Sequence, residues 1–224
     1  MKFIMAYSGG KDCTLALDRM IRQGHELVAM FTTISYEGFN HNHLIRKEVF
    51  QAYEECLGIP VIFCNASEIH HTEPIYKELK EAIEKYDAEA ICTGDIYLEH
   101  VALWNKRMTE DLGVEWSCPL WNEPTEAILN EFLERGYKAR IKAVKRDRLG
   151  EEYLGKEITS ALISEVKQKG IDVCGENGEY HSITLNGPIF KKPLPVVMQN
   201  IFRSQNYSVY DVLLLRQWLK SIKL

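Results

Sequence analysis

The sequence predicts an α/β protein, in which a parallel β-sheet carries helices on both faces and is followed by a smaller α+β unit. Three observations lead to this fold class. The first half of the chain alternates short apolar runs with segments of helical periodicity, the pattern of a parallel sheet built from right-handed crossovers. That alternation stops after Trp121. The length of 224 residues, 46% of them hydrophobic, suffices for one domain or two small ones.

The parallel strands are predicted where short apolar runs have the length of a buried strand. In chain order these runs cover Lys2–Tyr7, Glu26–Ile34, Pro60–Cys64 and Glu89–Thr93. Because a helical pattern follows each run, we expect the strands to be joined by crossovers and to run parallel.

Helices are predicted after each of these strands. In the first of them, Leu15, Ala16, Met20 and Ile21 lie close to helical spacing. A glycine follows the first, second and fourth helices and ends them. The four helices cover Asp12–Gln23, His41–Leu57, Thr72–Tyr86 and Tyr97–Leu112.

A second unit is predicted after Trp121, so we divide the chain into residues 1–120 and 121–224. Its helices and strands are expected at Thr125–Arg135, Tyr137–Val144, Ile158–Lys169 and Tyr180–Leu185. Residues 209–224 have apolar residues at helical spacing with basic residues opposite them. We interpret them as a helix that packs on its own unit, with docking on a membrane surface or on another subunit as the alternatives.

Composition and charge exclude several classes of protein. No apolar run approaches the roughly 20 residues that a bilayer requires, so no membrane span is expected. The six cysteines form no CxxC pair and the start has no secretory pattern, which favours reduced thiols and a cytoplasmic location. The net charge of −5 argues against general nucleic-acid binding. Residues 191–224 are basic. A further interpretation is that copies of the chain contact one another in a homo-oligomer.

The most informative motif is Ser8-Gly9-Gly10-Lys11-Asp12, which follows the first strand and opens the first helix. The two glycines let the backbone approach an anion, and the amides at a helix start attract phosphate. Lys11 adds a positive charge, and Asp12 is a candidate Mg²⁺ ligand. The alternative is a tight turn with solvated charges. We expect the loop to be exposed. The position of the motif favours phosphate binding.

These residues resemble the PP-loop of ATP pyrophosphatases, and within that superfamily the chain resembles the diphthine–ammonia ligase family over residues 1–190. The resemblance is carried by Tyr7–Asp12, Gly94-Asp95-Ile96, Cys118-Pro119-Leu120-Trp121 and Gly175-Glu176-Asn177-Gly178-Glu179-Tyr180. It implies a Rossmann-like ATP domain, ATP and Mg²⁺ as cofactors, and a carboxylate that is adenylylated and then captured by ammonia as an amide. The family's acceptor is diphthine on elongation factor 2, in archaea and eukaryotes. A protein from another source would need a different, small acid.

The chain departs from the family pattern at two places. Cys13 stands where the family usually has Ser, so a hydroxyl donor to phosphate is missing, and Thr14 is a candidate substitute. In the late motif, Asn177 replaces a usual Gly, and His181-Ser182 replaces an acidic or polar residue plus Thr. These differences do not affect the prediction that the protein binds a nucleotide. They do affect the identity of the acceptor, which the resemblance alone does not fix.

Two sets of residues complete the predicted site. Glu176 and Glu179 lie three apart in a Gly-rich turn that can aim carboxylates into a cleft, where they would serve the acceptor and ammonia; the alternative is a solvated acidic turn. Asp95 follows the fourth strand on the rim of the phosphate loop, as a Mg²⁺ ligand or as a helix N-cap. The nucleotide-side candidates are Thr32, Thr33, His43 and Gly94, with Ser8, Gly9, Gly10, Lys11, Asp12, Cys13 and Thr14.

The leading hypothesis is therefore an ATP-dependent amide ligase with Lys11, Asp12, Glu176 and Glu179 in catalysis. Because we expect the Ser8–Asp12 loop to be exposed, Lys11→Ala should abolish ATP turnover while the protein stays folded. One alternative is a tRNA-modifying PP-loop enzyme, although no cysteine arrangement suits sulfur transfer. The other is an ATP-binding protein without chemistry of its own.

Overall fold

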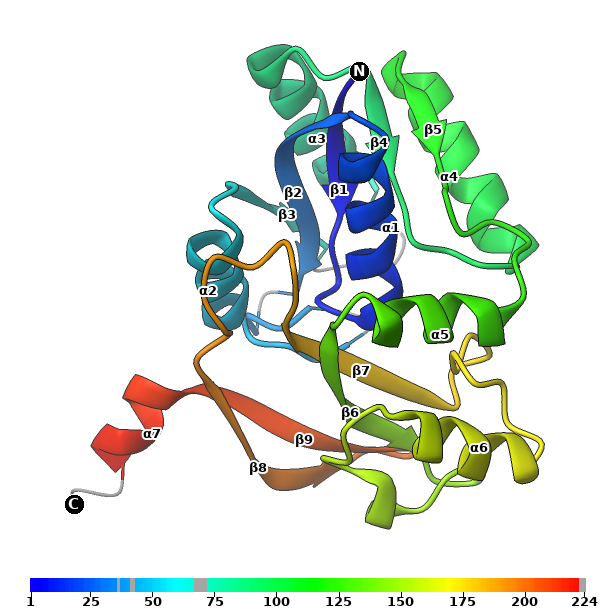
Figure 1. Cartoon of the computed structure of the whole chain (residues 1–224). Helices are drawn as coiled ribbons and strands as arrows, with labels where there is room; N and C mark the ends of the chain where they lie inside the picture. Colours follow the sequence, from blue (N-terminus) through cyan, green and yellow to red (C-terminus); the bar gives the residue numbers. More distant parts are fainter. Residues whose placement is uncertain (36, 41–42, 67–71, 222–224) are drawn as a thin grey trace.

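The first half of the chain forms a five-stranded parallel sheet (Figure 1), as predicted. This computed structural model describes residues 1–35, 37–40, 43–66 and 72–221. The strands lie in the order β3-β2-β1-β4-β5, so the order reverses on either side of β1. Their bounds are β1 Lys2–Ala6, β2 Glu26–Ile34, β3 Val61–Asn65, β4 Ala90–Cys92 and β5 Glu115–Ser117. The edge strand β5 has three residues and was not predicted.

Helices cover both faces of this sheet. Their bounds are α1 Lys11–Arg22, α2 Lys47–Leu57, α3 Glu73–Tyr86 and α4 Glu99–Leu112. The alternation of side chains along β1 assigns the two faces: Phe3 and Met5 belong to the core that includes Leu15 of α1, whereas Ile4 belongs to the core that includes Leu79 of α3. Because both faces are apolar, β1 is buried along its whole centre.

The second helix is shorter than the predicted His41–Leu57. Residues 41 and 42 lie outside the described residues, and α2 begins at Lys47. Before it, the Asn40 side chain accepts a hydrogen bond from the amide of His43 at 2.8 Å, and Leu44 has a φ of 51°. A side chain that bonds to the nearby backbone competes with helix formation, so this segment forms a turn.

The second half of the chain contains a four-stranded antiparallel sheet in the order β7-β6-β9-β8. Helices α5 and α6 and the final helix α7 accompany it. The bounds are α5 Thr125–Glu134, β6 Lys138–Lys145, η1 Glu151–Tyr153, α6 Ser160–Gln168, β7 Tyr180–Asn186, β8 Val196–Arg203, β9 Tyr207–Leu214 and α7 Leu215–Ser221. The boundary that we predicted near Trp121 lies between β5 and α5.

The predicted helix over residues 209–224 is wrong for its first half. Residues up to Leu214 belong to β9, which pairs with both β6 and β8, and α7 begins at Leu215. The apolar residues Val209, Val212 and Leu214 fit strand alternation only in part, so their spacing does not separate the two structures. These residues form a strand because they pair with β6 on one side and with β8 on the other. Among the described residues, no helix is long and apolar enough to cross a membrane.

The antiparallel sheet adjoins the carboxyl edge of the parallel sheet, so that β7 passes the start of α1 (Figure 1). The amide of Thr184 in β7 donates to the carbonyl of Gly9 at 2.8 Å. On the other side of α1, Arg19 pairs with Glu123 at 2.6 Å and with Glu131 of α5 at 2.5 Å. The phosphate-type loop therefore lies between the two halves of the chain.

Candidate active site

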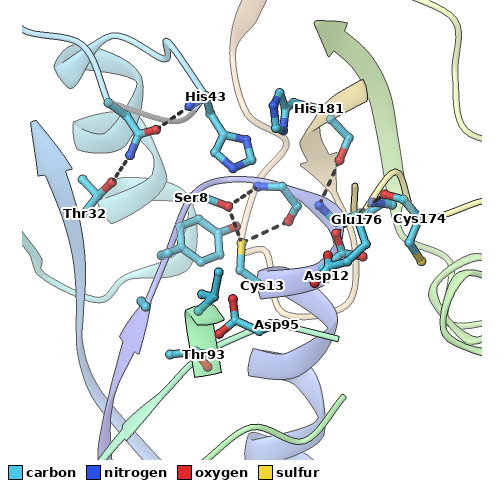
Figure 2. Close-up of a pocket in the computed structure, with 18 of the residues that line it drawn as sticks. Ser8, Asp12, Cys13, Thr32, His43, Thr93, Asp95, Cys174, Glu176 and His181 are labelled. Carbon is cyan, nitrogen blue, oxygen red and sulfur yellow. Dashed lines mark hydrogen bonds and ion pairs between the residues drawn. The ribbon is translucent and has the colours of Figure 1, made fainter. Parts of the chain in front are cut away.

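The Ser8–Asp12 motif forms a tight loop between β1 and α1, as predicted (Figure 2). Gly9 has a φ of 78°, a conformation that other residues rarely adopt. Gly10 is the N-cap of α1 and offers no capping side chain. The first turn of α1 thus presents main-chain amides next to a cavity, which is the arrangement that binds phosphate groups.

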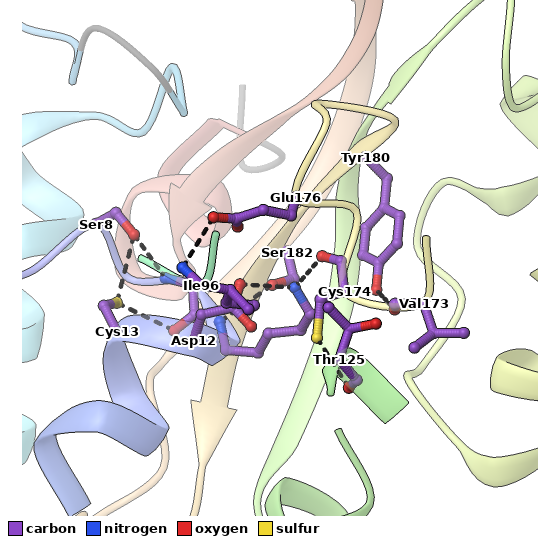
Figure 3. A network of polar contacts seen from close by, with 12 residues as sticks. Ser8, Asp12, Cys13, Ile96, Thr125, Val173, Cys174, Glu176, Tyr180 and Ser182 are labelled. Carbon is purple, nitrogen blue, oxygen red and sulfur yellow. Dashed lines mark hydrogen bonds and ion pairs between the residues drawn. The ribbon is translucent and has the colours of Figure 1, made fainter. Parts of the chain in front are cut away.

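Lys11 is buried, and the expectation that it is exposed is wrong. Its side chain is 3% exposed, and its Nζ donates to Asp12 Oδ2 at 2.8 Å and to the main-chain carbonyl of Cys174 (Figure 3). Burial by itself lowers the pKa of Lys11, but the Asp12 carboxylate, with Tyr180 and Cys174, raises that pKa well above its ordinary value. Lys11 is therefore a fixed positive charge at the start of α1.

The first turn of α1 is also held by side chains. The amide of Lys11 donates to Ser182 Oγ at 3.1 Å. Ser8 Oγ donates to the Cys13 sulfur at 3.3 Å, and that thiol donates to the Gly10 carbonyl at 3.2 Å. Thr14 is fully buried and its hydroxyl donates to the same carbonyl at 2.7 Å. Thr14 therefore faces the core, which contradicts the expectation that it supplies the hydroxyl that Cys13 lacks.

A cavity of about 380 Å³ opens beside this loop. Most of the predicted nucleotide and catalytic residues line it, from five separate segments of the chain. They are Ser8, Gly10, Lys11, Asp12, Cys13, Thr32, Thr33, His43, Gly94, Asp95 and Glu176. Gly9, Thr14 and Glu179 lie outside the lining. Sequence reasoning missed Asn40, whose amide nitrogen donates to Thr32 Oγ1 at 2.8 Å, and Trp104, which is 42% exposed.

Gly94 explains how the loop after β4 comes so close to α1. A Cβ at this position would lie 2.7 Å from both the Cα and the amide nitrogen of Cys13. Main-chain atoms cannot give way as a flexible side chain can, so only glycine fits there. The contact places Asp95, the next residue, on the same cavity as the phosphate-type loop.

Asp12 and Asp95 fit a Mg²⁺ ion that is shared with phosphate groups. Asp12 Oδ1 is buried and has no partner among the described residues. Asp95 Oδ2 accepts from Asn105 Nδ2 at 2.8 Å, and burial raises the pKa of Asp95. The N-cap of α4 is Leu98, so Asp95 does not cap the helix. In the described part of the chain, no three His, Cys, Asp or Glu residues gather as a metal site, but Mg²⁺ commonly uses one or two carboxylates plus substrate phosphates.

Glu176 comes from the second half of the chain and reaches the cavity (Figure 3). Its Oε1 accepts from the amide of Ile96 at 2.9 Å. Burial, aided by the Asp12 and Asp95 charges, raises the pKa of Glu176 to about 7. A carboxylate with this pKa can take up a proton near neutral pH. The alternative interpretation as a solvated acidic turn is wrong for Glu176, which is held in a polar network.

A second chamber of about 490 Å³ adjoins the first. Five residues line both chambers, and they mark the passage between them: His43, Asp95, Val101, Glu176 and His181. The rest of the second chamber is formed chiefly by β6, β9 and the start of α4, with Leu98, Tyr207 and Val209 among its residues.

Two imidazole rings stand at this passage. The ring centres of His43 and His181 are 4.7 Å apart, and His181 also stacks on Tyr207. Burial lowers the pKa of His181 to about 4 and that of His43 well below its ordinary value, with Lys142 contributing in both cases. Both rings are therefore neutral at physiological pH.

Lys142 lies behind these rings and was not predicted as a site residue. Alternation along its strand predicts an outward side chain, but a bulge between Ile141 and Ala143 turns Lys142 inward. It is fully buried and donates to the main-chain carbonyl of His43. Burial lowers the pKa of Lys142 to about 7. No signal in the sequence marks this bulge.

The sheet order and the Gly-Gly-Lys-Asp loop at the reversal of that order define a phosphate-loop α/β protein of the Rossmann-like type. Residues 1–116 match the family model described as the diphthamide synthase N-terminal domain, and residues 124–215 match that of the diphthamide synthase C-terminal domain. The chain belongs to the diphthamide synthase family.

Several curated relatives share this family. The diphthine–ammonia ligase of Schizosaccharomyces pombe is 27% identical over 214 residues, which cover 86% of this chain and 35% of the relative. Those of Rattus norvegicus and Homo sapiens are 26% identical over 226 residues, which cover 88% of this chain and 83% of each relative. The chain thus spans about a third of the yeast protein and most of the mammalian ones.

Among solved structures, one described as a predicted subunit of a tRNA methyltransferase from Methanocaldococcus jannaschii covers 86% of this chain and 99% of its own. Its sequence identity is 12% and its TM-score 0.44. A likeness of this size carries no argument about function.

Proposed function

We propose that this protein is an ATP-dependent amide ligase, which adenylylates a carboxylate, releases pyrophosphate and then forms the amide with ammonia. One observation carries the proposal. The Ser8–Asp12 loop and Glu176, which lie far apart in the sequence, line one cavity, and this cavity adjoins a second chamber. Family membership supports the same activity. In this scheme residues 1–120 bind the nucleotide and residues 121–224 complete the acceptor side.

The nucleotide would bind in the first chamber. Its phosphates would lie at the amides of the Gly10–Asp12 turn, with Lys11 as a fixed counter-charge, and its base near Thr32 and Thr33 on the same cavity. Asp12 and Asp95 would hold Mg²⁺, which neutralises charge on the phosphates. Because Lys11 is anchored to Cys174, its charge needs no rearrangement as the pyrophosphate leaves.

The acceptor would enter through the second chamber. An oxygen of its carboxylate attacks the α-phosphorus of ATP, a new P–O bond forms, and the bond to the β-phosphate oxygen breaks with its electron pair on pyrophosphate. The neutral rings of His43 and His181 stand where the two chambers meet, so they can donate hydrogen bonds to the carboxylate or to the α-phosphate without repelling a cation.

The second step would take place beside Glu176. Ammonium transfers a proton to the Glu176 carboxylate, and the lone pair of the resulting ammonia attacks the acyl carbon. The bond between that carbon and the AMP oxygen breaks with its electron pair on AMP, and the second proton leaves with AMP to the solvent. A base with a pKa of about 7 is suited to this transfer near neutral pH.

The names of the relatives, which contain diphthine and ammonia, support a proposal for the acceptor class. We propose protein-bound diphthine on elongation factor 2, in the cytoplasm, as the acceptor if the source makes diphthamide, and a small carboxylic acid otherwise. The replacement His181 lines the acceptor chamber, and Asn177 follows Glu176 of the same lining, so both bear on this choice.

A screen of carboxylates for AMP and pyrophosphate formation, with and without ammonium, tests the proposal. We expect pyrophosphate exchange with one acceptor alone and amide formation after ammonium is added. Leu98→Trp, which narrows the second chamber and spares the first, should raise the KM for the acceptor and leave ATP binding unchanged. Retention of intact ATP with every acceptor would overturn the proposal in favour of a nucleotide-binding protein without chemistry. Sulfur incorporation into RNA would support a tRNA-modifying enzyme instead.

A further inference from the structure

Glu179 is a buried carboxylate that forms no ion pair with any residue that the structure describes. Its side chain is 3% exposed, and its Oε1 lies 3.4 Å from Asn177 Nδ2. Its Oε2 is shielded from solvent and has no hydrogen-bond partner among the described residues. A carboxylate that is removed from water without a partner is costly, so such a group calls for a cation.

An uncharged oxygen lies close to Glu179. The Asn177 Nδ2 atom that contacts Glu179 Oε1 at 3.4 Å also donates to the hydroxyl oxygen of Tyr97 at 3.0 Å. One amide nitrogen thus links the carboxylate to the Tyr97 hydroxyl, so a cation bound to Glu179 would have a neutral oxygen atom nearby.

The donor set favours a monovalent ion over a divalent one. One carboxylate with a neutral oxygen carries a single negative charge, whereas divalent metal sites built by protein usually need several carboxylates. Within the described part of the chain, no group of three His, Cys, Asp or Glu residues is placed to hold a metal. Ammonium has four N–H donors and one positive charge, so it can bond to the carboxylate and to a neutral oxygen at once.

The position of Glu179 suits delivery of ammonium to the reaction. Glu179 lies at the end of the turn that carries Glu176, three residues away, and Glu176 lines both chambers. The hydroxyl of Tyr207 donates to the Gly178 carbonyl at 2.8 Å, and Tyr207 lines the acceptor chamber. An ion at Glu179 would thus lie next to the passage where the acyl adenylate is formed.

We propose that Glu179, together with the hydroxyl of Tyr97, binds the ammonium ion that the reaction consumes. The proposal rests on the proposed ligase function and gives the two glutamates of the turn separate roles. Glu179 binds the cation, and Glu176 takes up the proton. Potassium has a similar size and charge, so the experiment distinguishes a substrate site from a structural potassium site.

The kinetic test compares two nucleophiles on the full-length protein. Glu179→Gln keeps the shape of the side chain and removes its charge. The KM for ammonium should rise by about tenfold or more, the effect of losing one charge-assisted contact. Hydroxylamine is uncharged at mildly alkaline pH, so its KM should stay the same. The ATP–pyrophosphate exchange rate should also be unchanged. Glu152→Gln, at an exposed glutamate, is the matched control and should change none of these values.

A second variant guards against misfolding of the first. Tyr97→Phe keeps the carboxylate and the aromatic ring and removes the hydroxyl oxygen, and it should give a smaller rise in the KM for ammonium. Equal KM values for ammonium in the wild type and in both folded variants would overturn the proposal. An equal loss of activity with ammonium and hydroxylamine would also overturn it, because that pattern indicates a general structural role.

Direct binding gives a readout without catalysis. Crystals soaked in thallium(I), an ammonium mimic, should show an anomalous peak beside Glu179 Oε2 that ammonium displaces and that is absent in Glu179→Gln. A peak that potassium displaces and ammonium does not would identify a structural ion site and overturn the proposal, as would the absence of a peak in the wild type. If no acceptor supports pyrophosphate exchange, the ligase function fails while the thallium result still decides on the ion site.

Discussion

The main-chain amide of Lys11 donates a hydrogen bond to the hydroxyl of Ser182 at 3.1 Å, across 171 positions of the sequence. This bond joins the first turn of α1 to β7. A second hydrogen bond connects the same two segments: the amide of Thr184 in β7 donates to the Gly9 carbonyl at 2.8 Å. The phosphate-type loop is thus shaped by the second sheet as well as by its own glycines.

Removing the Ser182 hydroxyl should loosen this junction. Ser182 is 3% exposed, so Ser182→Ala leaves the Lys11 amide without its acceptor and should lower the free energy of unfolding by about 1–2 kcal/mol. Denaturant unfolding measures this change. Ser164→Ala, at an exposed serine of α6, is the control and should have little effect. Equal destabilisation by the two variants would show that the bond contributes nothing specific.

Replacing Lys11 should abolish turnover and also weaken the fold. Lys11→Met keeps most of the side-chain volume but removes the charge at the helix start and the bonds to Asp12 and Cys174. We expect AMP formation to fall by about 100-fold or more, with a lower melting temperature. The control is Lys138→Met at an exposed site on β6. Undiminished AMP formation by Lys11→Met would contradict the proposed site.

A side chain at position 94 should disrupt the contact between the β4 loop and α1. In Gly94→Ala the new Cβ would meet main-chain atoms of Cys13 at 2.7 Å, so one of the two segments must move. We expect a loss of about 1–3 kcal/mol of stability and weaker ATP binding, as measured by calorimetry. Gly150→Ala is a suitable control, because its Cβ would meet only the flexible end of the Glu152 side chain. If Gly94→Ala binds ATP like the wild type, the close approach has no functional importance.

The ammonia step should depend on pH through Glu176. Burial raises its pKa to about 7, so the carboxylate form that accepts a proton is lost as the pH falls below that value. Amide formation should therefore fall by about tenfold per pH unit below 7 and level off above it. Glu176→Gln should abolish this limb of the profile while ATP–pyrophosphate exchange continues. A limb of unchanged position in the variant would assign the titration to another group.

The sequence predicted the parallel sheet well because local patterns determine it. Each of β1 to β4 is an apolar run followed by an amphipathic helix, and the crossover rule then orders them. The errors in the predicted secondary structure occur where contacts outside the local apolar pattern determine the structure. The stretch around Val212 suits a helix or a strand locally, and pairing with β6 and β8 selects the strand. The start of α2 was missed because the Asn40 side chain stabilises a turn.

Some residues of the candidate site could likewise be predicted from the sequence, and others could not. Ser8–Asp12, Asp95 and Glu176 could be found because motifs carry them, and the cavity brings them together. The burial of Lys11 could not be foreseen, since its partner is a carbonyl 163 positions away. Lys142 was missed because a bulge, which leaves no mark in the apolar pattern, reverses the direction of its side chain.

The reliance of the loop on β7 has a consequence for biosynthesis. A ribosome completes the Ser8–Asp12 motif before it adds the hydrogen-bond partners Cys174, Ser182 and Thr184, two of which follow Lys11 by 163 and 171 positions. A nascent chain that has emerged only as far as β5 thus contains the motif without the strand that braces it. Nucleotide affinity should accordingly arise only after β7 has been synthesised and packs against α1.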